Sequence, residues 1–240
     1  MTPDYVLAAS QRILAAVLPL FKRTPGAVAD ADAYAAYRRL VDRLLADTRA
    51  AARSATLADD LAAIVDGYRT AAGDMRAVLD GLDRVVVAAR AVVPVTARTA
   101  TLAQQRSNEL ALAGYLECLA IAGQAQAVAA VTLRSHDEAQ RLRARLVRSF
   151  DVAVDRASDR GDIEVLRLLR ETLGKIARDL IERGRPLARI VAYETAVPLP
   201  AVVLAHMLYQ DGARADELVA ENAGHDHPSF MPAAGRAYSR

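Results

Sequence analysis

Apolar side chains recur at intervals of three and four residues through most of the first 185 positions of the chain. Over residues 30–53, apolar positions keep this spacing, and arginines and aspartates fill many of the positions between them. Such spacing gives an α-helix one apolar face and one polar face. The pattern predicts about six or seven helices of roughly 15 to 35 residues, and their short connections predict that successive helices pack antiparallel in a multi-helix bundle.

Two features of the sequence mark where helices begin and end. Ser135 and Glu138 have the spacing of a capping box, in which each side chain accepts a hydrogen bond from a backbone N–H at the start of a helix. Residues 184–186, Gly-Arg-Pro, end the last long helix, because glycine is favoured just past a helix end and proline cannot continue a helix. This break predicts a helical bundle domain over 1–185 and a small module over 186–240.

The small module has a different pattern from the helices before it. A β-favouring run ends at Tyr193. A helix is expected from about Pro198 to Tyr209, because proline is tolerated in the first helical turn. Residues 210–212 predict a turn in which glycine takes the positive φ, and a second short helix follows over 213–222. The expected order is strand, helix, helix and extended tail.

The end of the module is irregular in sequence. Two prolines bracket Phe230 and Met231 and predict extended structure there. The residues after Gly235 favour a strand poorly, so we expect a closing strand that is short, supplied by a partner or absent. On this interpretation the segment 228–240 becomes ordered only in an assembly, where a neighbouring protein covers the two large apolar side chains.

This segment resembles the carboxy-terminal part of the tail/DNA-circularisation proteins of Mu-like phages and, more distantly, the LysM-like modules of phage tail proteins. The residues that carry the resemblance include Pro198, Leu199, Pro200, Leu204, Leu208, Tyr209, Asp211, Asn222, Pro228, Phe230 and Gly235. A weaker match covers 97–185, and the amino-terminal DNA-circularisation domain of that family is not seen. The resemblance implies a mainly α protein with a small C-terminal α+β LysM-like module. It assigns to that module's motif and core Leu199, Leu204, Leu208, Tyr209, Asp211, Asn222, Pro228 and Phe230.

The resemblance also implies a function and a location. It points to a non-enzymatic structural or assembly protein of a phage or phage-derived contractile tail, near the baseplate hub, with a link to DNA-end protection or circularisation. The expected partners are other tail and baseplate proteins, and copies of the chain in a symmetric ring. The expected location is the virion tail, and the host bacterial cytoplasm during assembly. The alternatives are a peptidoglycan-binding LysM-like module on a helical stalk and a host adaptor derived from a prophage.

Two groups of polar residues have competing interpretations. Tyr209, Asp211 and Asn222 suggest a glycan pocket, but we favour a structural role in which the tyrosine packs between the short helices and the other two cap them. Arg141, Arg145 and Arg148 have helical spacing and are candidate DNA contacts through phosphate. The favoured interpretation of this stripe is a solvated helix face, because acidic residues lie nearby and no groove-reading motif is present.

The net charge and the remaining ionisable and ligand-forming residues predict neither catalysis nor a bound cofactor. The net charge of +2 does not demand an anionic partner, and the single Cys118 excludes an intramolecular disulfide. The sequence around His225 and His227 lacks further ligands at metal-binding spacing, so no metal is expected. The apolar stretch 110–133 is rich in alanine and contains Glu117, which favours a buried helix over a membrane span.

Overall fold

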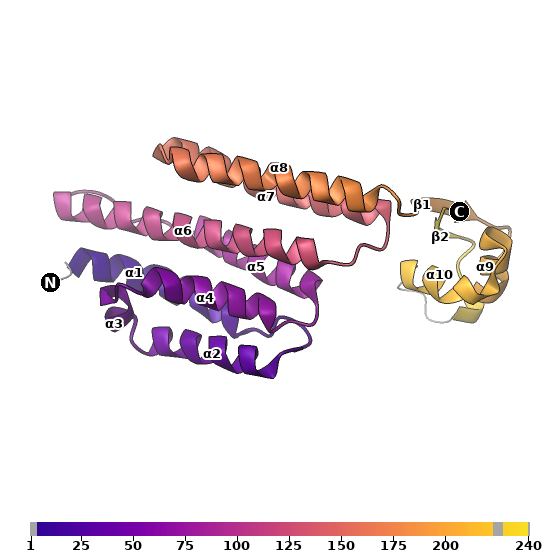
Figure 1. The fold of residues 1–240 in the computed structure, drawn as a ribbon, viewed down its shortest axis with the longest axis horizontal. Coiled ribbons are helices and arrows are strands. Elements are labelled where there is room, and N and C mark those ends of the chain that lie inside the picture. The colour runs from indigo at the N-terminus through magenta and orange to yellow at the C-terminus, as the bar shows by residue number, and fades with distance from the viewer. Residues whose placement is uncertain (1–3, 223–227, 240) are drawn as a thin grey trace. The chain divides into compact units, whose positions relative to one another are not determined.

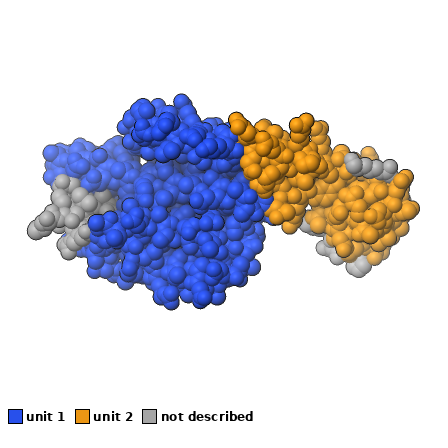
Figure 2. Space-filling model, viewed as in Figure 1, with its two compact units in different colours: residues 1–131, 146–176 blue, residues 132–145, 177–240 orange. Residues whose placement is uncertain are grey.

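The structure is a computed structural model that describes residues 4–222 and 228–239. These residues form ten α-helices and one antiparallel sheet of two strands near the C-terminus. Figure 1 labels these elements along the ribbon. The prediction of a mainly α protein with a small C-terminal sheet is therefore confirmed. The chain divides into two compact units, which Figure 2 colours separately. The first unit contains residues 1–131 and 146–176, and the second contains 132–145 and 177–240.

Helices make up most of the first unit. They are α1 (Asp4–Val17), α2 (Ala31–Ala46), α3 (Thr48–Arg53), α4 (Leu57–Thr70), α5 (Met75–Arg90) and α6 (Ala100–Ala130), and a 3₁₀ turn, η1 (Leu18–Lys22), follows α1. Two further helices, α7 (His136–Arg160) and α8 (Ile163–Gly184), begin in one unit and end in the other. Within the first unit, α6 packs along α5 and α1, and α2 packs against α4.

The predicted single helix over 30–53 is in fact two helices. Asp47 leaves helical geometry, with φ −141°, and its carboxylate accepts a hydrogen bond from the N–H of Ala50 at 2.8 Å. This interaction caps α3 and explains the break, because aspartate is among the side chains that best satisfy the free N–H groups of a helix start. Asp74 caps α5 in the same way, because its carboxylate accepts a hydrogen bond from the N–H of Arg76 at 2.9 Å.

The long helix α6 lies inside the first unit, as expected for the stretch 110–133. Its small residues permit close packing: a Cβ on Gly123 would lie 2.8 Å from a methyl carbon of Val65, on α4. None of the described helices is both long enough and apolar enough to cross a membrane. Instead, α6 contains carboxylates with almost no exposed surface, at Glu109 and Glu117.

Each buried carboxylate of α6 is held by arginines from other helices. Glu117 accepts from Nε of Arg90 on α5 at 2.7 Å and lies 3.5 Å from Nε of Arg156 on α7. Glu109 accepts from Arg12 of α1 at 2.7 Å. Charge is costly to bury unless it is paired and hydrogen-bonded, so these contacts make the burial of both glutamates possible.

The capping box predicted at Ser135 is formed in part, because Ser135 caps α7 as expected and Glu138 reaches the N–H of the preceding residue, Arg134. The N–H of Glu138 donates to Ser135 Oγ at 3.1 Å, and the Glu138 carboxylate accepts from the N–H of Arg134 at 2.7 Å. The first turn of α7 also holds the chain that leads into the sheet. The N–H of His136 donates to the carbonyl of Ala188 at 3.0 Å.

The rest of the second unit is a small α+β arrangement. Its elements are β1 (Ile190–Glu194), α9 (Ala201–Tyr209), the 3₁₀ turn η2 (Gly212–Arg214), α10 (Ala215–Glu221), the 3₁₀ turn η3 (Pro228–Phe230) and β2 (Ala234–Tyr238). The strands pair antiparallel, from Ile190 opposite Tyr238 to Glu194 opposite Ala234. Of the alternatives expected for the closing strand, the structure shows the short one, β2 of five residues, and η3 replaces part of the expected extended segment. The predicted domain boundary at residue 186 stays a prediction.

Candidate functional site

Residues 190–222 and 228–239 enclose a compact apolar core. The core contains Tyr193, Ala201, Leu204, Ala205, Tyr209, Ala215, Leu218, Met231 and Ala237, with Leu208 packed against it. Leu199 is half-buried, and its backbone pairs with Met231 in an isolated bridge. Met231 was expected on the surface, but it is 1% exposed because this bridge draws it under α9 and into the core. Phe230 lies outside the core, with 73% of its surface exposed, and Pro228 is exposed as well.

Tyr209 at the end of α9 is part of the core. Its hydroxyl accepts a hydrogen bond from the N–H of Tyr238 on β2 at 2.9 Å, and the guanidinium of Arg214 lies 4.0 Å from its ring centre. Burial raises the pKa of the Tyr209 hydroxyl, and the hydrogen bond from Tyr238 and the charge of Arg214 oppose that rise. Both the ring and the hydroxyl of this tyrosine are thus engaged within the chain.

Asn222 joins the end of α10 to β2. Its side-chain amide donates to the carbonyls of Leu218 at 2.8 Å and Arg236 at 2.7 Å, and its Oδ1 accepts from the N–H of Arg236 at 2.8 Å. Gly235 makes the close approach possible, because a Cβ there would lie 2.6 Å from both Asn222 Oδ1 and the Tyr193 hydroxyl. The asparagine therefore caps α10, as expected. It also satisfies the backbone N–H and C=O of Arg236, which a neighbouring strand would otherwise bond.

The turn between the short helices differs in detail from the expectation. Gln210, not Gly212, has the positive φ, at 59°, and it ends α9. Asp211 follows in extended geometry and accepts from the N–H of Ala213 at 2.9 Å. Because this cap starts η2, glycine at position 212 sits within the helical turn and has no need of a positive φ.

One face of α9 is apolar and exposed. Val202, Val203 and Met207 on this helix are 59%, 45% and 59% exposed, and Phe230 lies in η3, which packs against α9. We call these four residues the α9 surface. The helix contains no Asp, Glu, Lys or Arg. The sequence signal for this surface was the high apolar content of α9, from which the sequence named Leu204, Leu208 and Tyr209 as core and gave Val202, Val203 and Met207 no separate role.

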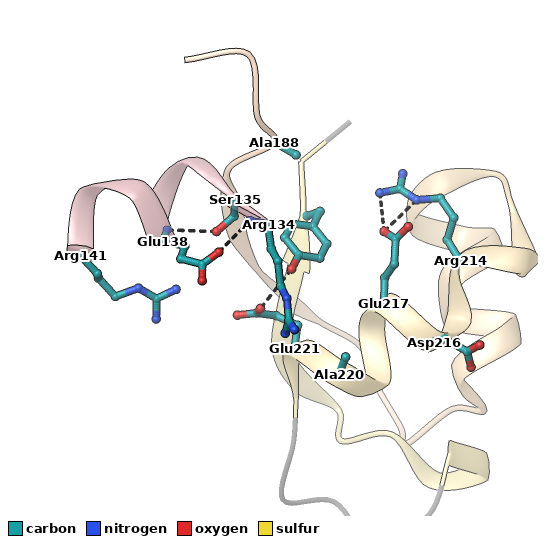
Figure 3. Close-up of a pocket in the computed structure, with 11 residues that line it drawn as sticks. Arg134, Ser135, Glu138, Arg141, Ala188, Arg214, Asp216, Glu217, Ala220 and Glu221 are labelled. Atoms are coloured by element: carbon teal, nitrogen blue, oxygen red, sulfur yellow. Dashed lines mark hydrogen bonds and ion pairs between the residues drawn. The ribbon is translucent and has the colours of Figure 1, made fainter. Parts of the chain in front are cut away.

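A polar groove of about 850 Å³ lies in the second unit, and Figure 3 shows its lining. One side comes from Arg134, just before α7, and Arg141, on α7, and the other comes from η2 and α10. There Arg214 is bonded to Glu217 at 2.7 and 3.0 Å, at a spacing of three residues. The hydroxyl of Tyr238 lies 3.5 Å from a carboxylate oxygen of Glu221. The lining combines both signs of charge, so the groove favours a polar ligand without selecting anions or cations.

The candidate DNA contacts all lie on α7. Arg141 and Arg148 are exposed and Arg145 is half-buried, and Nε of Arg141 donates to the carbonyl of Asp137. Acidic residues share the helix, including Glu138. The role of these arginines in DNA contact stays a prediction.

Among the described residues, no arrangement of side chains favours a metal site or a reactive thiol. Residues 225–227, which contain the two neighbouring histidines, lie outside the described residues. Within 4–222 and 228–239, no group of three or more His, Cys, Asp or Glu side chains is arranged to hold a metal ion. Burial, together with the neighbouring Glu117 charge, raises the pKa of the Cys118 thiol, which opposes formation of the nucleophilic thiolate.

Comparison of the sequence with known proteins adds no identification, because no family model and no curated protein matches the chain.

Proposed function

We propose that this protein is a non-enzymatic assembly protein of a phage or phage-derived contractile tail, and that the α9 surface contacts a neighbouring tail subunit. The observation that carries the proposal is the exposure of Val202, Val203, Met207 and Phe230 on and beside a helix without Asp, Glu, Lys or Arg, in which the exposed polar side chain is His206. Burying apolar surface is favourable by about 25 cal/mol per Å², and grouped exposed apolar residues mark interaction sites. A protein contact is the role that best fits this surface.

The tail context comes from the sequence resemblance, and the arrangement of the second unit supports it. A LysM-like module has the order strand, helix, helix, strand, which agrees with β1, α9, α10 and β2. Tyr209 at the end of the first short helix and Asn222 at the end of the second both hold β2, which gives structural roles to two residues of the motif. An antiparallel helical bundle, a position near the baseplate hub and a symmetric ring of copies belong to the same proposal.

The glycan-reading alternative is less favoured by the contacts of Tyr209. A sugar-binding tyrosine offers its ring face to the ligand, whereas Tyr209 as a residue is 8% exposed and the guanidinium of Arg214 lies over its ring. A role at DNA ends rests on the resemblance alone, so it stays secondary to the structural role.

The test is a charge placed on the α9 surface. Met207→Glu puts a carboxylate where a neighbour would bury an apolar side chain, and Val87→Glu is the matched control, because Val87 is 64% exposed on α5 of the first unit. Mass spectrometry of purified tail particles measures incorporation of each variant. We expect Met207→Glu to lower incorporation at least about tenfold, which corresponds to about 1.4 kcal/mol of lost contact energy, with the control unchanged.

Two results would contradict the proposal. Absence of the wild-type chain from particles would remove the tail assignment. Equal incorporation of both variants, together with sedimentation of the intact protein with purified peptidoglycan, would favour the glycan reader instead.

A further inference from the structure

The two-stranded sheet has two outer edges, and its register decides which backbone groups face them. Beyond the strand ends, Ser239 donates to the Arg189 carbonyl and Thr195 donates to the Ala233 carbonyl. These two contacts define hydrogen-bonded pairs at both ends of the ladder. Bonded and non-bonded pairs alternate along an antiparallel ladder, and counting inward from either end makes the pair formed by Ala192 and Arg236 a non-bonded one. The N–H and C=O groups of both residues therefore point away from the sheet.

Side chains of the same chain occupy the outer edge of β2. Asn222 bonds both the N–H and the C=O of Arg236, at 2.8 and 2.7 Å. The hydroxyl of Tyr209 accepts from the N–H of Tyr238 at 2.9 Å. This edge is closed to a further strand, because its hydrogen-bonding groups are already engaged.

The outer edge of β1 is closed only at its first residue. The carboxylate of Asp137, on α7, accepts from the N–H of Ile190 at 2.7 Å. Ala192 and Glu194 are exposed, and their outward N–H and C=O groups have no partner within the ranges that the structure describes. Glu194 also forms no ion pair among those residues. This open stretch matches the backbone of one extended segment.

We propose that the β1 edge, defined by Ala192 and Glu194, accepts an extended segment of another protein that carries basic side chains. Main-chain hydrogen bonds would add the segment as a third strand, as in other cases of strand addition. Two carboxylates, those of Asp137 and Glu194, flank this edge and favour lysine or arginine on the incoming segment. The cationic neighbour across the sheet, Arg236, is already paired with Glu221 at 3.0 Å.

A second copy of the chain fits this edge poorly. Two antiparallel β1 strands centred on Ala192 would place Glu194 opposite Ile190 of the other copy. The N–H of Ile190 is already held by Asp137, so half of the bonds at each end would be lost. The pairing would also bring Glu194 toward Asp137 of the other copy, and like charges across strands are unfavourable.

The probe is a short blocked peptide that alternates valine and lysine, and the matched probe replaces each lysine with glutamate. Residue-resolved amide hydrogen exchange of the full chain is measured with and without each peptide. We expect the valine–lysine peptide at saturation to slow exchange at Ala192 and Glu194 at least about tenfold, and the acidic peptide to have a smaller effect. Arg236 and Tyr238, which are already bonded, serve as internal references.

Ala192→Pro provides the second arm of the test, because it removes the outward N–H without removing a bond to β2. Its control, Ala192→Thr, keeps that N–H and suits a strand. We expect the threonine variant to retain the peptide effect and the proline variant to lose it while Arg236 stays protected. No slowing with either peptide would overturn the proposal. Equal effects of both peptides would overturn its charge preference, and slowing that depends on protein concentration alone would assign the edge to a second copy.

Discussion

The two units use different polar contacts to hold their elements together. In the first unit, ion pairs join helices across the buried α6, where Glu117 meets Arg90 and Arg156. In the second unit, side chains bond the backbone of the strands: the neutral amide of Asn222 and hydroxyl of Tyr209 hold β2, and the carboxylate of Asp137 holds the first residue of β1. The first arrangement is built on pairs of oppositely charged side chains, whereas the second satisfies the outer backbone groups of a two-stranded sheet.

The difference follows from the size of the two cores. A long helix with helices on several sides can keep a charge buried, because more than one arginine reaches it and the surrounding core supplies the stability that desolvation removes. The small core of the second unit has little stability to spare. Neutral hydrogen bonds to the backbone avoid the desolvation of a charge while satisfying strand groups that have no neighbouring strand. The units should therefore respond to different substitutions.

The largest expected effect is that of Tyr209→Ala on the second unit. Removal of a buried aromatic ring typically destabilises a protein by about 3–5 kcal/mol. We expect amide exchange across α9 and β2 to become fast while α6 keeps its protection. Tyr209→Phe is the matched control, since it keeps the ring and removes only the bond to Tyr238, at about 1 kcal/mol. Undiminished protection of α9 in the alanine variant would show that this tyrosine does not anchor the module.

The next effect is that of Glu117→Ala, which should act on the first unit alone. It leaves Arg90 and Arg156 beside a small cavity without their carboxylate, and loss of one partner of a buried pair typically destabilises by about 3–5 kcal/mol. We expect the lower end, because the two arginine side chains are 23% and 29% exposed. Urea unfolding followed by residue-resolved exchange measures the change. Glu117→Gln should have a smaller effect, and equal destabilisation of α9 would contradict the separation of the two units.

The sequence predicts an element of the fold well when the contacts that stabilise it join residues close together in the chain. Helical periodicity and capping spacing predict most helices of the first unit, including the start of α7 at Ser135. The break at Asp47 was missed because the apolar spacing continues across it. The sequence left open whether β2 forms within the chain, because part of its stabilisation comes from Asn222 and Tyr209, which are distant in sequence from the residues that they hold.

The candidate surfaces were harder to predict for a related reason. Apolar spacing marks Val203 and Leu204 as helical neighbours, but it cannot show which of them faces the core when a helix is apolar on every side. The structure buries Leu204 and exposes Val203. The open edge of β1 also depends on the register, which is decided by long-range pairing and not by the composition of the strand.

A smaller effect is expected from Asn222→Ala. The variant removes three hydrogen bonds and frees the backbone of Arg236, and the unsatisfied groups should destabilise the second unit by about 1–3 kcal/mol. We expect exchange at Arg236 to accelerate more than exchange at Tyr193. Asn222→Asp keeps the acceptor for the Arg236 N–H and loses the donors, so it should fall between the wild type and alanine. If alanine and aspartate variants behaved alike, the amide donors would carry the whole effect.

The smallest expected effect concerns alkaline pH and tests whether the tyrosines of each unit act separately. Burial raises the pKa of Tyr209 in the second unit and of Tyr68 in the first. A pKa that is higher in the folded state contributes stability below the unfolded value of about 10, and this contribution is lost as the pH rises through the folded pKa. Both units should therefore weaken in alkali. Tyr209→Phe should move the alkaline transition of the Met231 methyl resonance to higher pH and leave that of Ile64 unchanged. A shift of both resonances would mean that the two units unfold together in alkali.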